Sequence, residues 1–415
     1  MKKESITYPM NAMQWETYEE WVQDRAMTEY NTTVAVEMPR EKVSADRMAE
    51  ACQKVLDGQR YMHSHLVEMH DGDLQICEDW DMPNHVHRYE MSDAEWAETK
   101  EKFVKPFDLF HEALMRYHVV STETVTILIV ETHHLLFDGI AHKAAWFAVE
   151  DVLQGKEPYQ QGDMAAEFNR KEIEGYDSEP YRRAQAYYKE QLDGIRFTDI
   201  CADGDTPWGK MIETRPHFDA ATIDAGCQRL GVSFAVVFYA AYALALGEMA
   251  KAERVAFYTA SHGRSRQHTD RVYGNYLSAL PVIIDTNSEQ TISDLIKQTK
   301  SKLFTSMRHR TYPLFHLLRD IDSGDVGTEL SPQGEYIYEY LVVDGIEYPS
   351  YHIVTDLSLQ HLSTCILIRG DQYEVALDGS DALYTQEQLD QLAQLTGEYA
   401  IKLTSEDETN TIGDI

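Results

Sequence analysis

The sequence predicts an α/β protein of two lobes, and three observations lead to this expectation. Segments with helical and strand-like patterns alternate through both halves of the chain. The 415 residues, 43% of them hydrophobic, are too many for one ordinary hydrophobic core. A polar stretch at residues 160–193, rich in tyrosine and charge, is predicted to connect the halves. We place the first lobe at residues 1–170 and the second at residues 171–415, and we expect the second to lend a crossing segment to the first.

The elements of the first half follow from hydrophobic patterning. Val34 and Val36 alternate with polar neighbours, which indicates a strand, and Ser44 is suited to cap the amphipathic helix that follows. Residues 125–131 are β-branched and nearly all apolar, so they should form a central strand buried on both faces. In chain order, the predicted elements are a helix at 13–25, a strand at 32–37, a helix at 45–56, strands at 65–67, 74–77 and 125–131, and a helix from about 142 to 153.

The second half repeats this alternation. Its longest apolar run, residues 234–246, is shorter than the roughly 20 residues that a membrane span needs, so we predict a buried helix. The predicted elements are a helix at 234–250, strands at 255–259 and 280–285, a helix at 292–308, strands at 336–343 and 362–368, and a helix at 386–403.

The charge balance and the cysteines narrow the possible functions. Lys and Arg number 37 against 70 Asp and Glu, which gives a net charge of −33 and argues against binding to nucleic acid or to an anionic membrane. The five cysteines are scattered and form no C-x-x-C pair, as is typical of reduced thiols in a cytosolic protein. No apolar stretch follows the N-terminal M-K-K-E, so we expect no signal peptide and a cytoplasmic location.

One segment has the pattern of a reaction centre. Residues 133–139, H-H-L-L-F-D-G, directly follow the predicted buried strand. The strand can direct one imidazole into a cavity and its neighbour away from it, and a histidine can take a proton from an attacking nucleophile. Asp138 would orient the segment through a buried ion pair, and Gly139 would permit a tight turn or close approach by substrate.

These residues alone leave other interpretations open. Two histidines at the end of a strand can be purely structural. His134, Asp138 and His142 could also gather around a metal ion, but no H-E-x-x-H or C-x-x-C spacing supports zinc, and we expect no metal.

The motif and the sequence segments that flank it resemble those of the condensation domains of nonribosomal peptide synthetases, whose signature is H-H-x-x-x-D-G. The resemblance covers nearly the whole chain, with the motifs in the family's order. The matching segments are Y-P-M-N-A-M-Q at 8–14, K-P-F-D-L at 105–109, L-M-R at 114–116, G-V-S at 231–233, S-H-G-R at 261–264, Y-G-N-Y at 273–276, L-P at 280–281, H-R-T-Y-P-L at 309–314 and T-D-L-S-L at 355–359.

This resemblance implies a fold and a reaction. The fold would be two lobes like chloramphenicol acetyltransferase in a V-shaped pseudo-dimer, with a tunnel between them. The reaction would be an acyl transfer that forms an amide between a thioester-bound acyl donor and a carrier-bound aminoacyl acceptor. His134 would be the central catalytic residue, Asp138 structural and His133 also structural. Gly139, together with Asn275 from the second lobe, would shape the reaction centre.

The resemblance also implies partners. No cofactor would be tightly bound, because substrates arrive on the phosphopantetheine arms of acyl or peptidyl carrier domains, or as acyl-CoA. An adenylation domain would be adjacent, and we expect a monomer. Arg264, Arg266 and Arg271 could form a basic patch for an acidic carrier protein, or simply be solvated arginines of a loop.

The chain departs from the family pattern at two places. Residues 58–66 stand where the family usually shows R-H-E-x-L-R-T-x-F, and His63 takes the place of the second arginine, which pairs with the motif aspartate in several members. Asp138 therefore needs another partner, and Arg264 is our candidate. Ala141 replaces a serine that often follows the motif glycine.

The type of condensation is a separate expectation. Met1 lies only a few residues before the family's first motif, which favours a starter domain that N-acylates the first amino acid with a fatty acyl group. The alternatives are a mid-line domain with an aminoacyl or peptidyl donor, and a non-catalytic carrier-recruitment domain of the same fold. Recruitment domains typically lose the histidine motif, which this chain keeps.

Overall fold

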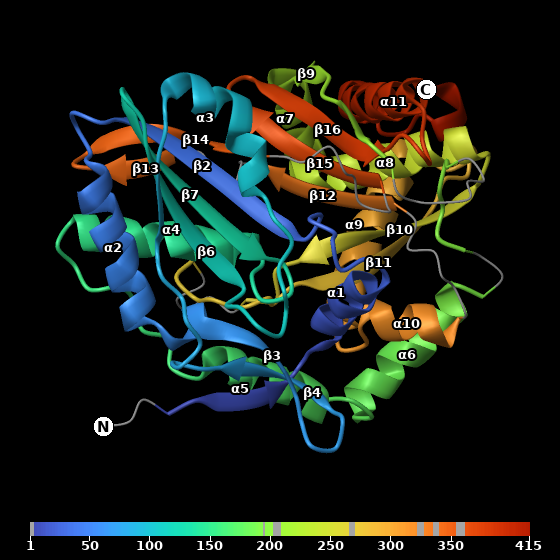
Figure 1. The fold of residues 1–415 in the computed structure, drawn as a ribbon. Helices are drawn as coiled ribbons and strands as arrows, with labels where there is room; N and C mark the ends of the chain where they lie inside the picture. The colour runs from blue at the N-terminus through green and yellow to red at the C-terminus, as the bar shows by residue number, and fades with distance from the viewer. Residues whose placement is uncertain are drawn as a thin grey trace. The chain divides into compact units, whose positions relative to one another are not determined.

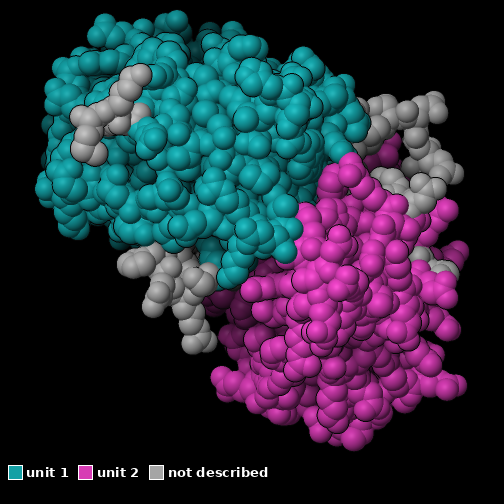
Figure 2. Space-filling view, turned by 90° about the horizontal axis from the view of Figure 1, so that it is seen from below, with its two compact units in different colours: residues 1–174, 262–277, 337–355 teal, residues 175–261, 278–336, 356–415 magenta. Residues whose placement is uncertain are grey.

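The chain folds as two compact units, each built from three segments (Figure 2). Unit 1 consists of residues 1–174, 262–277 and 337–355, and unit 2 of residues 175–261, 278–336 and 356–415. Two segments from the second half of the sequence thus belong to unit 1, so the units do not divide simply at residue 170. The computed structural model describes residues 4–193, 196–201, 209–264, 270–321, 328–334, 340–353 and 362–415.

Unit 1 contains a mixed sheet with the strand order β13-β14-β2-β7-β6-β5 (Figure 1). Residues 34–36 of β2 and residues 127–130 of β7 are fully buried, which means that both faces of these strands are covered. The prediction of a central strand at 125–131 is therefore confirmed. β14, from the segment 337–355, pairs antiparallel with β2.

The elements of unit 1 also include a small sheet with the order β1-β4-β3 and helices that flank both sheets. Their bounds are β1 (Ile6–Pro9), α1 (Ala12–Gln23), β2 (Asn31–Pro39), α2 (Ala45–Gly58), the 3-10 helix η1 (Arg60–His63), β3 (Ser64–Glu68), β4 (Leu74–Glu78), β5 (His87–Glu90), α3 (Asp93–Thr99), the 3-10 helix η2 (Lys100–Phe103), β6 (Met115–Ser121), β7 (Val125–His133), α4 (Gly139–Leu153), α5 (Met164–Glu174), β13 (Tyr340–Val343) and β14 (Ile346–His352).

Helix α4 begins three residues earlier than we predicted. Asp138 is its N-cap and accepts a hydrogen bond from the backbone N–H of Ala141 at 2.8 Å. A capping carboxylate satisfies an otherwise unpaired amide in the first turn, which fixes the helix start at Gly139 and not near His142. The predicted end of this helix at residue 153 is confirmed, and Gly155 follows with a φ of 77°.

Unit 2 is built on a second mixed sheet with the order β11-β10-β12-β15-β16-β8, and β9 pairs with β16 beside β8. Its elements are α6 (Glu179–Gln191), β8 (Met211–Thr214), β9 (His217–Asp219), α7 (Ala220–Leu230), α8 (Phe234–Ala250), β10 (Arg254–Ser261), β11 (Ser278–Asp285), α9 (Ile292–Arg308), α10 (Leu314–Asp320), β12 (Thr328–Gly334), β15 (Leu362–Arg369), β16 (Gln372–Ser380), α11 (Gln386–Ser405) and the 3-10 helix η3 (Ile412–Asp414).

Helix α8 forms the centre of the unit 2 core. Residues 236–247 are buried throughout, and α8 packs against α11, α9 and the strands β10 and β12 (Figure 1). A helix that is apolar on all sides needs such complete burial, which confirms the predicted buried helix. Among the described residues no single helix is both long and apolar enough to cross a membrane; α7 and α8 meet that test only as a pair, bent by 104°.

Some of the predicted features lie outside the described residues. These are Arg266, residues 336–339 of the predicted strand at 336–343, and residues 355–359 of the T-D-L-S-L segment. The described end of that predicted strand is β13.

Candidate active site

Strand β7 ends at His133, and this side chain is held in the interior of unit 1. It is 1% exposed, its Nδ1 accepts a hydrogen bond from the N–H of Leu135 at 3.2 Å, and the ring of Phe107 lies edge-on against it. Burial, followed by the charges of His134 and Arg116, lowers the pKa of His133 to about 3. The imidazole of His133 is thus neutral and part of the packing.

His134 is partly exposed, and both its backbone and its ring have defined neighbours. Its N–H donates to the carbonyl of Tyr30 at 2.7 Å, and the Tyr30 ring lies 6.3 Å from the imidazole. Burial lowers the pKa of His134, while the charge of Asp138 and a hydrogen bond to the histidine's own backbone raise it. Of the two ring nitrogens, only Nδ1 can reach that backbone.

Asn275 contacts His134 directly, although 141 residues separate them in sequence. Its Nδ2 donates to the carbonyl of His134 at 2.7 Å and lies 3.4 Å from Nδ1. The amide orientation is fixed because Oδ1 accepts from the N–H of Leu277 at 3.2 Å. We expected Asn275 to come from the second lobe, but it belongs to segment 262–277 of unit 1 and is 1% exposed.

Asp138 forms the buried ion pair that we predicted with Arg264. The guanidinium Nη2 lies 2.5 Å from Oδ1, and the two side chains are 3% and 1% exposed. The other carboxylate oxygen accepts from the N–H of Tyr276 at 3.1 Å. Asp138 thus connects the end of β7, the start of α4 and segment 262–277.

Arg264 and Gly274 complete this connection. Arg264 donates to the carbonyls of Val272 at 2.7 Å and Gly274 at 3.1 Å, and its guanidinium lies over the ring of Tyr276. Gly274 has a φ of 149°, and a Cβ there would collide with the Tyr276 ring. Arg264 and residues 272–276 are therefore held closely together, and a glycine is required at 274.

The structure also places the other residues that the sequence singled out near the motif. Gly139 is the first residue of α4 and does not have a positive φ, so its backbone does not exploit the freedom of glycine. His63 faces the carbonyls of Met82 and Leu56, at 2.8 Å and 3.0 Å, and not the carboxylate of Asp138. Ala141 is buried and donates its N–H to Asp138.

The basic patch that we considered for Arg264 and Arg271 does not form as a free surface. The guanidinium of Arg264 is buried against Asp138, and Arg271 pairs with Asp151 at 2.5 Å. The alternative interpretation, that Arg264 is a solvated arginine of a loop, is also wrong, because its side chain is buried. In unit 1, both arginines are engaged in ion pairs with α4 and its N-cap.

The alternative of a metal held by His134, Asp138 and His142 does not fit the geometry. Both oxygens of Asp138 are engaged by Arg264, Tyr276 and Ala141, and the Nδ1 of His142 lies 2.8 Å from the Thr132 hydroxyl. A different group of possible metal ligands, His65, Cys77 and Asp79, lies on the small sheet.

Sequence reasoning missed two residues at the site. Tyr30 accepts the hydrogen bond of the His134 backbone, and Asn11 donates to the carbonyl of Asn275 at 3.0 Å. Asn11 lies within the first matching motif, and this position could have pointed to it. No sequence signal could have identified Tyr30, because it contributes only a backbone carbonyl.

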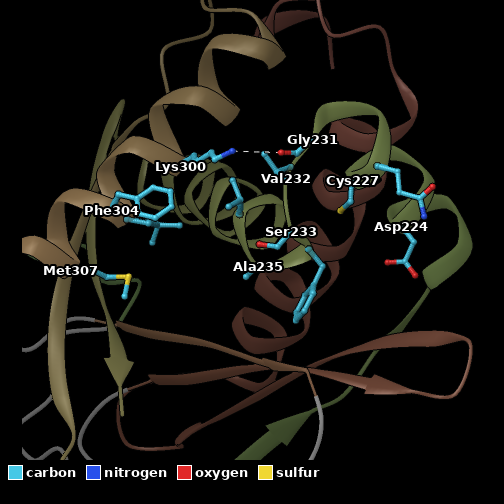
Figure 3. A pocket seen from close by; sticks show the side chains of 13 residues that line it. Asp224, Cys227, Gly231, Val232, Ser233, Ala235, Lys300, Phe304 and Met307 are labelled. Carbon is cyan, nitrogen blue, oxygen red and sulfur yellow. Dashed lines mark hydrogen bonds between the residues drawn. The ribbon is translucent and has the colours of Figure 1, made fainter. Parts of the chain in front are cut away.

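Unit 2 has a pocket of about 670 Å³ between α7, the start of α8 and α9 (Figure 3). Its walls are mainly apolar, and two large side chains of α9, Phe304 and Met307, are 58% and 53% exposed. Lys300 lies at the rim, where it donates to the carbonyl of Gly231 at 3.5 Å (Figure 3). No pattern in the sequence predicted this pocket.

Comparison with known proteins places these features in a family. The family model described as "Condensation domain" matches residues 4–330. Polyketide synthase PksN of Bacillus subtilis (strain 168) is 23% identical over 54% of this chain and 4% of the relative. Gramicidin S synthase 2 of Aneurinibacillus migulanus is 21% identical over 73% of this chain and 7% of the relative. Tyrocidine synthase 3 of Brevibacillus parabrevis is 20% identical over 68% of this chain and 4% of the relative. The chain therefore spans less than a tenth of the length of these curated relatives.

Solved structures show the same fold. The first condensation domain of the calcium-dependent antibiotic synthetase, in complex with a substrate analogue, has a TM-score of 0.81 at 14% identity, with 99% of this chain and 98% of that chain covered. The starter condensation domain of rhizomide synthetase has a TM-score of 0.80 at 17% identity, with 99% of both chains covered. These likenesses confirm the two-lobed α/β fold class. Because the family model covers well over half of its residues, the chain belongs to the condensation domain family.

Proposed function

We propose that the protein forms an amide bond between a thioester-bound acyl donor and the amine of a carrier-bound aminoacyl acceptor. The nitrogen of the amine attacks the thioester carbonyl, the new N–C bond forms, and the C–S bond breaks. The thiol leaves with the proton that the amine loses. The observation that carries this proposal is His134 at the end of β7, held by Asn275 beside the Asp138–Arg264 ion pair.

His134 is suited to handle the proton in this reaction. If Nδ1–H donates to the residue's own carbonyl, the Nε2 lone pair is available to the amine. The same nitrogen, once protonated, can stabilise the tetrahedral intermediate by donating a hydrogen bond. The lowered pKa keeps His134 in the neutral form that a base requires. We propose Gly139 as a backbone neighbour of the developing oxyanion.

The test is the rate of amide formation with carrier-loaded substrates. His134→Ala should reduce product formation by about 10² or more if His134 acts as the base. His85→Ala, which alters an exposed histidine, serves as the matched control. A His134→Ala rate equal to the wild-type rate would remove this residue from the mechanism.

We further propose that the protein is of the starter type, with a fatty acyl donor. Support comes from the likeness to the starter condensation domain of rhizomide synthetase, one structure of which is in complex with C8-CoA, although the likeness itself concerns the fold. An apolar donor site would gain about 0.8 kcal/mol for each methylene group that it buries. The alternative is a mid-line domain with an aminoacyl or peptidyl donor.

A donor panel separates these two types. The protein is incubated with an aminoacyl carrier protein and either acyl-CoA thioesters of increasing chain length or peptidyl carrier donors, and intact-protein mass spectrometry follows the acceptor. The starter type predicts a mass increase with fatty acyl donors. Transfer from peptidyl donors alone would contradict it and would leave the amide-forming reaction unchanged.

Carrier proteins and a neighbouring adenylation domain are the partners that we propose, and α9 is the surface that we propose for a carrier. In a chain of net charge −33, this helix and the residues just after it present exposed Lys297, Lys300, Arg308 and Arg310. Exposed Phe304 adds an apolar contact beside the pocket. An acidic carrier protein with an apolar patch would complement both properties.

The docking surface is tested with two forms of the same substrate. Lys300→Glu and Phe304→Ser should raise KM for a carrier-bound aminoacyl or acyl substrate, but not for its N-acetylcysteamine thioester, which lacks the carrier. Lys171→Glu, an exposed charge reversal in unit 1, is the control. Equal effects on both substrate forms would show that α9 does not recognise the carrier.

The non-catalytic recruitment alternative predicts binding of a loaded carrier without turnover in the assays above. The cytoplasmic location, the monomeric state and the absence of a tightly bound cofactor also stay predictions.

A further inference from the structure

Three side chains that commonly bind metals meet at one end of the small sheet of unit 1. His65 lies on β3 directly opposite Cys77 on β4, and Asp79 is the first residue after β4, which ends at Glu78. The ligand atoms of the three residues all lie within 4.8 Å of one another. We propose that His65, Cys77 and Asp79 bind a zinc ion.

The types of ligand and their separations fit this ion. Zinc binds imidazole nitrogen, thiolate sulfur and carboxylate oxygen at about 2.0–2.3 Å, with tetrahedral geometry. Two ligand atoms at such distances are about 3.5 Å apart, so these side chains need to approach by only about 1 Å. Three protein ligands leave the fourth coordination position to a water molecule.

Neighbouring groups orient two of the three ligands. The hydroxyl of Ser5 and the N–H of Asp81 both donate to Oδ1 of Asp79, at 2.5 Å and 3.0 Å, which leaves Oδ2 for the metal. The Nδ1 of His65 lies 3.5 Å from the carbonyl of His63, which favours a proton on Nδ1 and a free lone pair on Nε2. Outer partners of this kind are typical of histidine and carboxylate ligands.

The protonation states of the ligands define the binding step. Burial lowers the pKa of His65, against the effects of the His63 carbonyl and Asp79, so its imidazole is neutral and ready to coordinate. Burial, with Asp79 and Glu78, raises the pKa of the Cys77 thiol to about 11. Zinc binding would therefore displace one proton from Cys77. The Nε2–zinc and Oδ2–zinc bonds need no proton release.

The proposed ion would cross-link the small sheet. It would join β3 to β4, and through the bond from Ser5 to Asp79 it would also hold the residues that lead into β1. We infer a structural role for this site, and the inference does not depend on the proposed amide-forming reaction.

Cobalt(II) is the probe, because a cobalt–thiolate bond gives a charge-transfer band in the near ultraviolet. The full chain, stripped of metals, carries Cys201→Ser to remove an exposed thiol. One equivalent of cobalt should produce the thiolate band and the visible bands of four-coordinate cobalt, and zinc should displace it. Cys77→Ser should abolish the thiolate band, and His65→Ala and Asp79→Asn should weaken binding at least tenfold. His70→Ala, in the exposed turn between β3 and β4, should leave binding unchanged.

Two results would overturn the proposal: no saturable binding at one equivalent, or a thiolate band that persists in Cys77→Ser. Thermal unfolding provides a second test, which does not depend on whether the Cys77→Ser variant folds. Zinc should raise the melting temperature of the wild-type chain, and Asp79→Asn, which changes a partly exposed side chain, should lose this increase. An equal increase in wild type and Asp79→Asn would place the metal elsewhere.

Discussion

At the residue scale, Asp138 has a structural role that can be separated from catalysis. Its carboxylate pairs with Arg264, caps α4 and accepts from Tyr276, and the pair is almost fully buried. Removing one partner of a buried ion pair leaves an uncompensated charge, which costs about 3–5 kcal/mol.

We therefore predict that Asp138→Ala lowers the melting temperature and the yield of folded protein more than His134→Ala does. Thermal unfolding followed by circular dichroism is the measurement. Glu157→Ala removes an exposed ion pair with Lys54 and should cost at most about 1 kcal/mol. An Asp138→Ala variant that is fully stable but inactive would show that this carboxylate acts in the chemistry.

A second prediction at this scale concerns two glycines that both have positive φ. Gly274→Ala would combine backbone strain with a collision against the Tyr276 ring, whereas Gly72, with a φ of 84°, has open space around the position of a Cβ. Overpacking typically costs about 1–3 kcal/mol in addition to the strain. Gly274→Ala should therefore be clearly less stable than Gly72→Ala in urea unfolding. Equal stabilities would indicate that segment 262–277 adapts easily.

At the scale of elements, the sequence predicted well those segments whose burial is uniform. β7 and α8 were predicted because their residues are almost all apolar, and their lengths and composition distinguish strand from helix. β7 has 9 residues rich in β-branched side chains, whereas α8 has 17 residues rich in alanine. Edge strands such as β5 (H-R-Y-E) and β9 (H-F-D) were missed, since their polar residues face solvent and only their pairing with β6 and β16 identifies them.

The site was predictable only through the motif. No periodicity relates His134 to Asn275 or Asp138 to Arg264, which are 141 and 126 residues apart, and the family resemblance alone brought them into one hypothesis. The start of α4 was missed for a local reason, because Asp138 was assigned to an ion pair and its second role as N-cap was overlooked.

Helix α1 carries an ionisable group that should make stability depend on pH. Burial, followed by the charges of Glu20 and Glu19, raises the pKa of Glu16 from 4.5 to about 8. Between these values the folded state binds more protons than the unfolded state. The stability that Glu16 contributes is therefore fully present below pH 4.5 and is lost as the pH rises through 8.

Glu16→Gln should remove this dependence. Its free energy of unfolding should exceed that of the wild type increasingly between about pH 4.5 and 8, and above pH 8 the difference should level off on the order of 1–2 kcal/mol for a partly exposed side chain. Thermal unfolding at a series of pH values is the measurement. Glu50→Gln, on the exposed face of α2, is the control and should follow the wild type. A constant difference between Glu16→Gln and wild type at all pH values would contradict the assignment.

At the scale of the whole molecule, each unit is built from segments that are separated in sequence. Unit 1 needs residues 262–277 and 337–355 in addition to residues 1–174. The first of these segments supplies Arg264, Asn275 and Tyr276, and the second supplies β14, which covers the edge of β2.

We predict that a fragment of residues 1–174 does not fold as an independent domain, even though it contains the complete motif H-H-L-L-F-D-G. It would leave Asp138 buried without Arg264, at a cost of about 3–5 kcal/mol, and would expose the β2 edge to pairing with other chains. Because a whole domain is stable by only about 5–15 kcal/mol, these losses should abolish cooperative unfolding. The measurement is calorimetry and size-exclusion chromatography of residues 1–174 beside the full chain, with a fragment of residues 1–193 as a control for the cut position. A cooperative melting transition from a monomeric 1–174 fragment would show that the later segments are accessories to unit 1 and not parts of its fold.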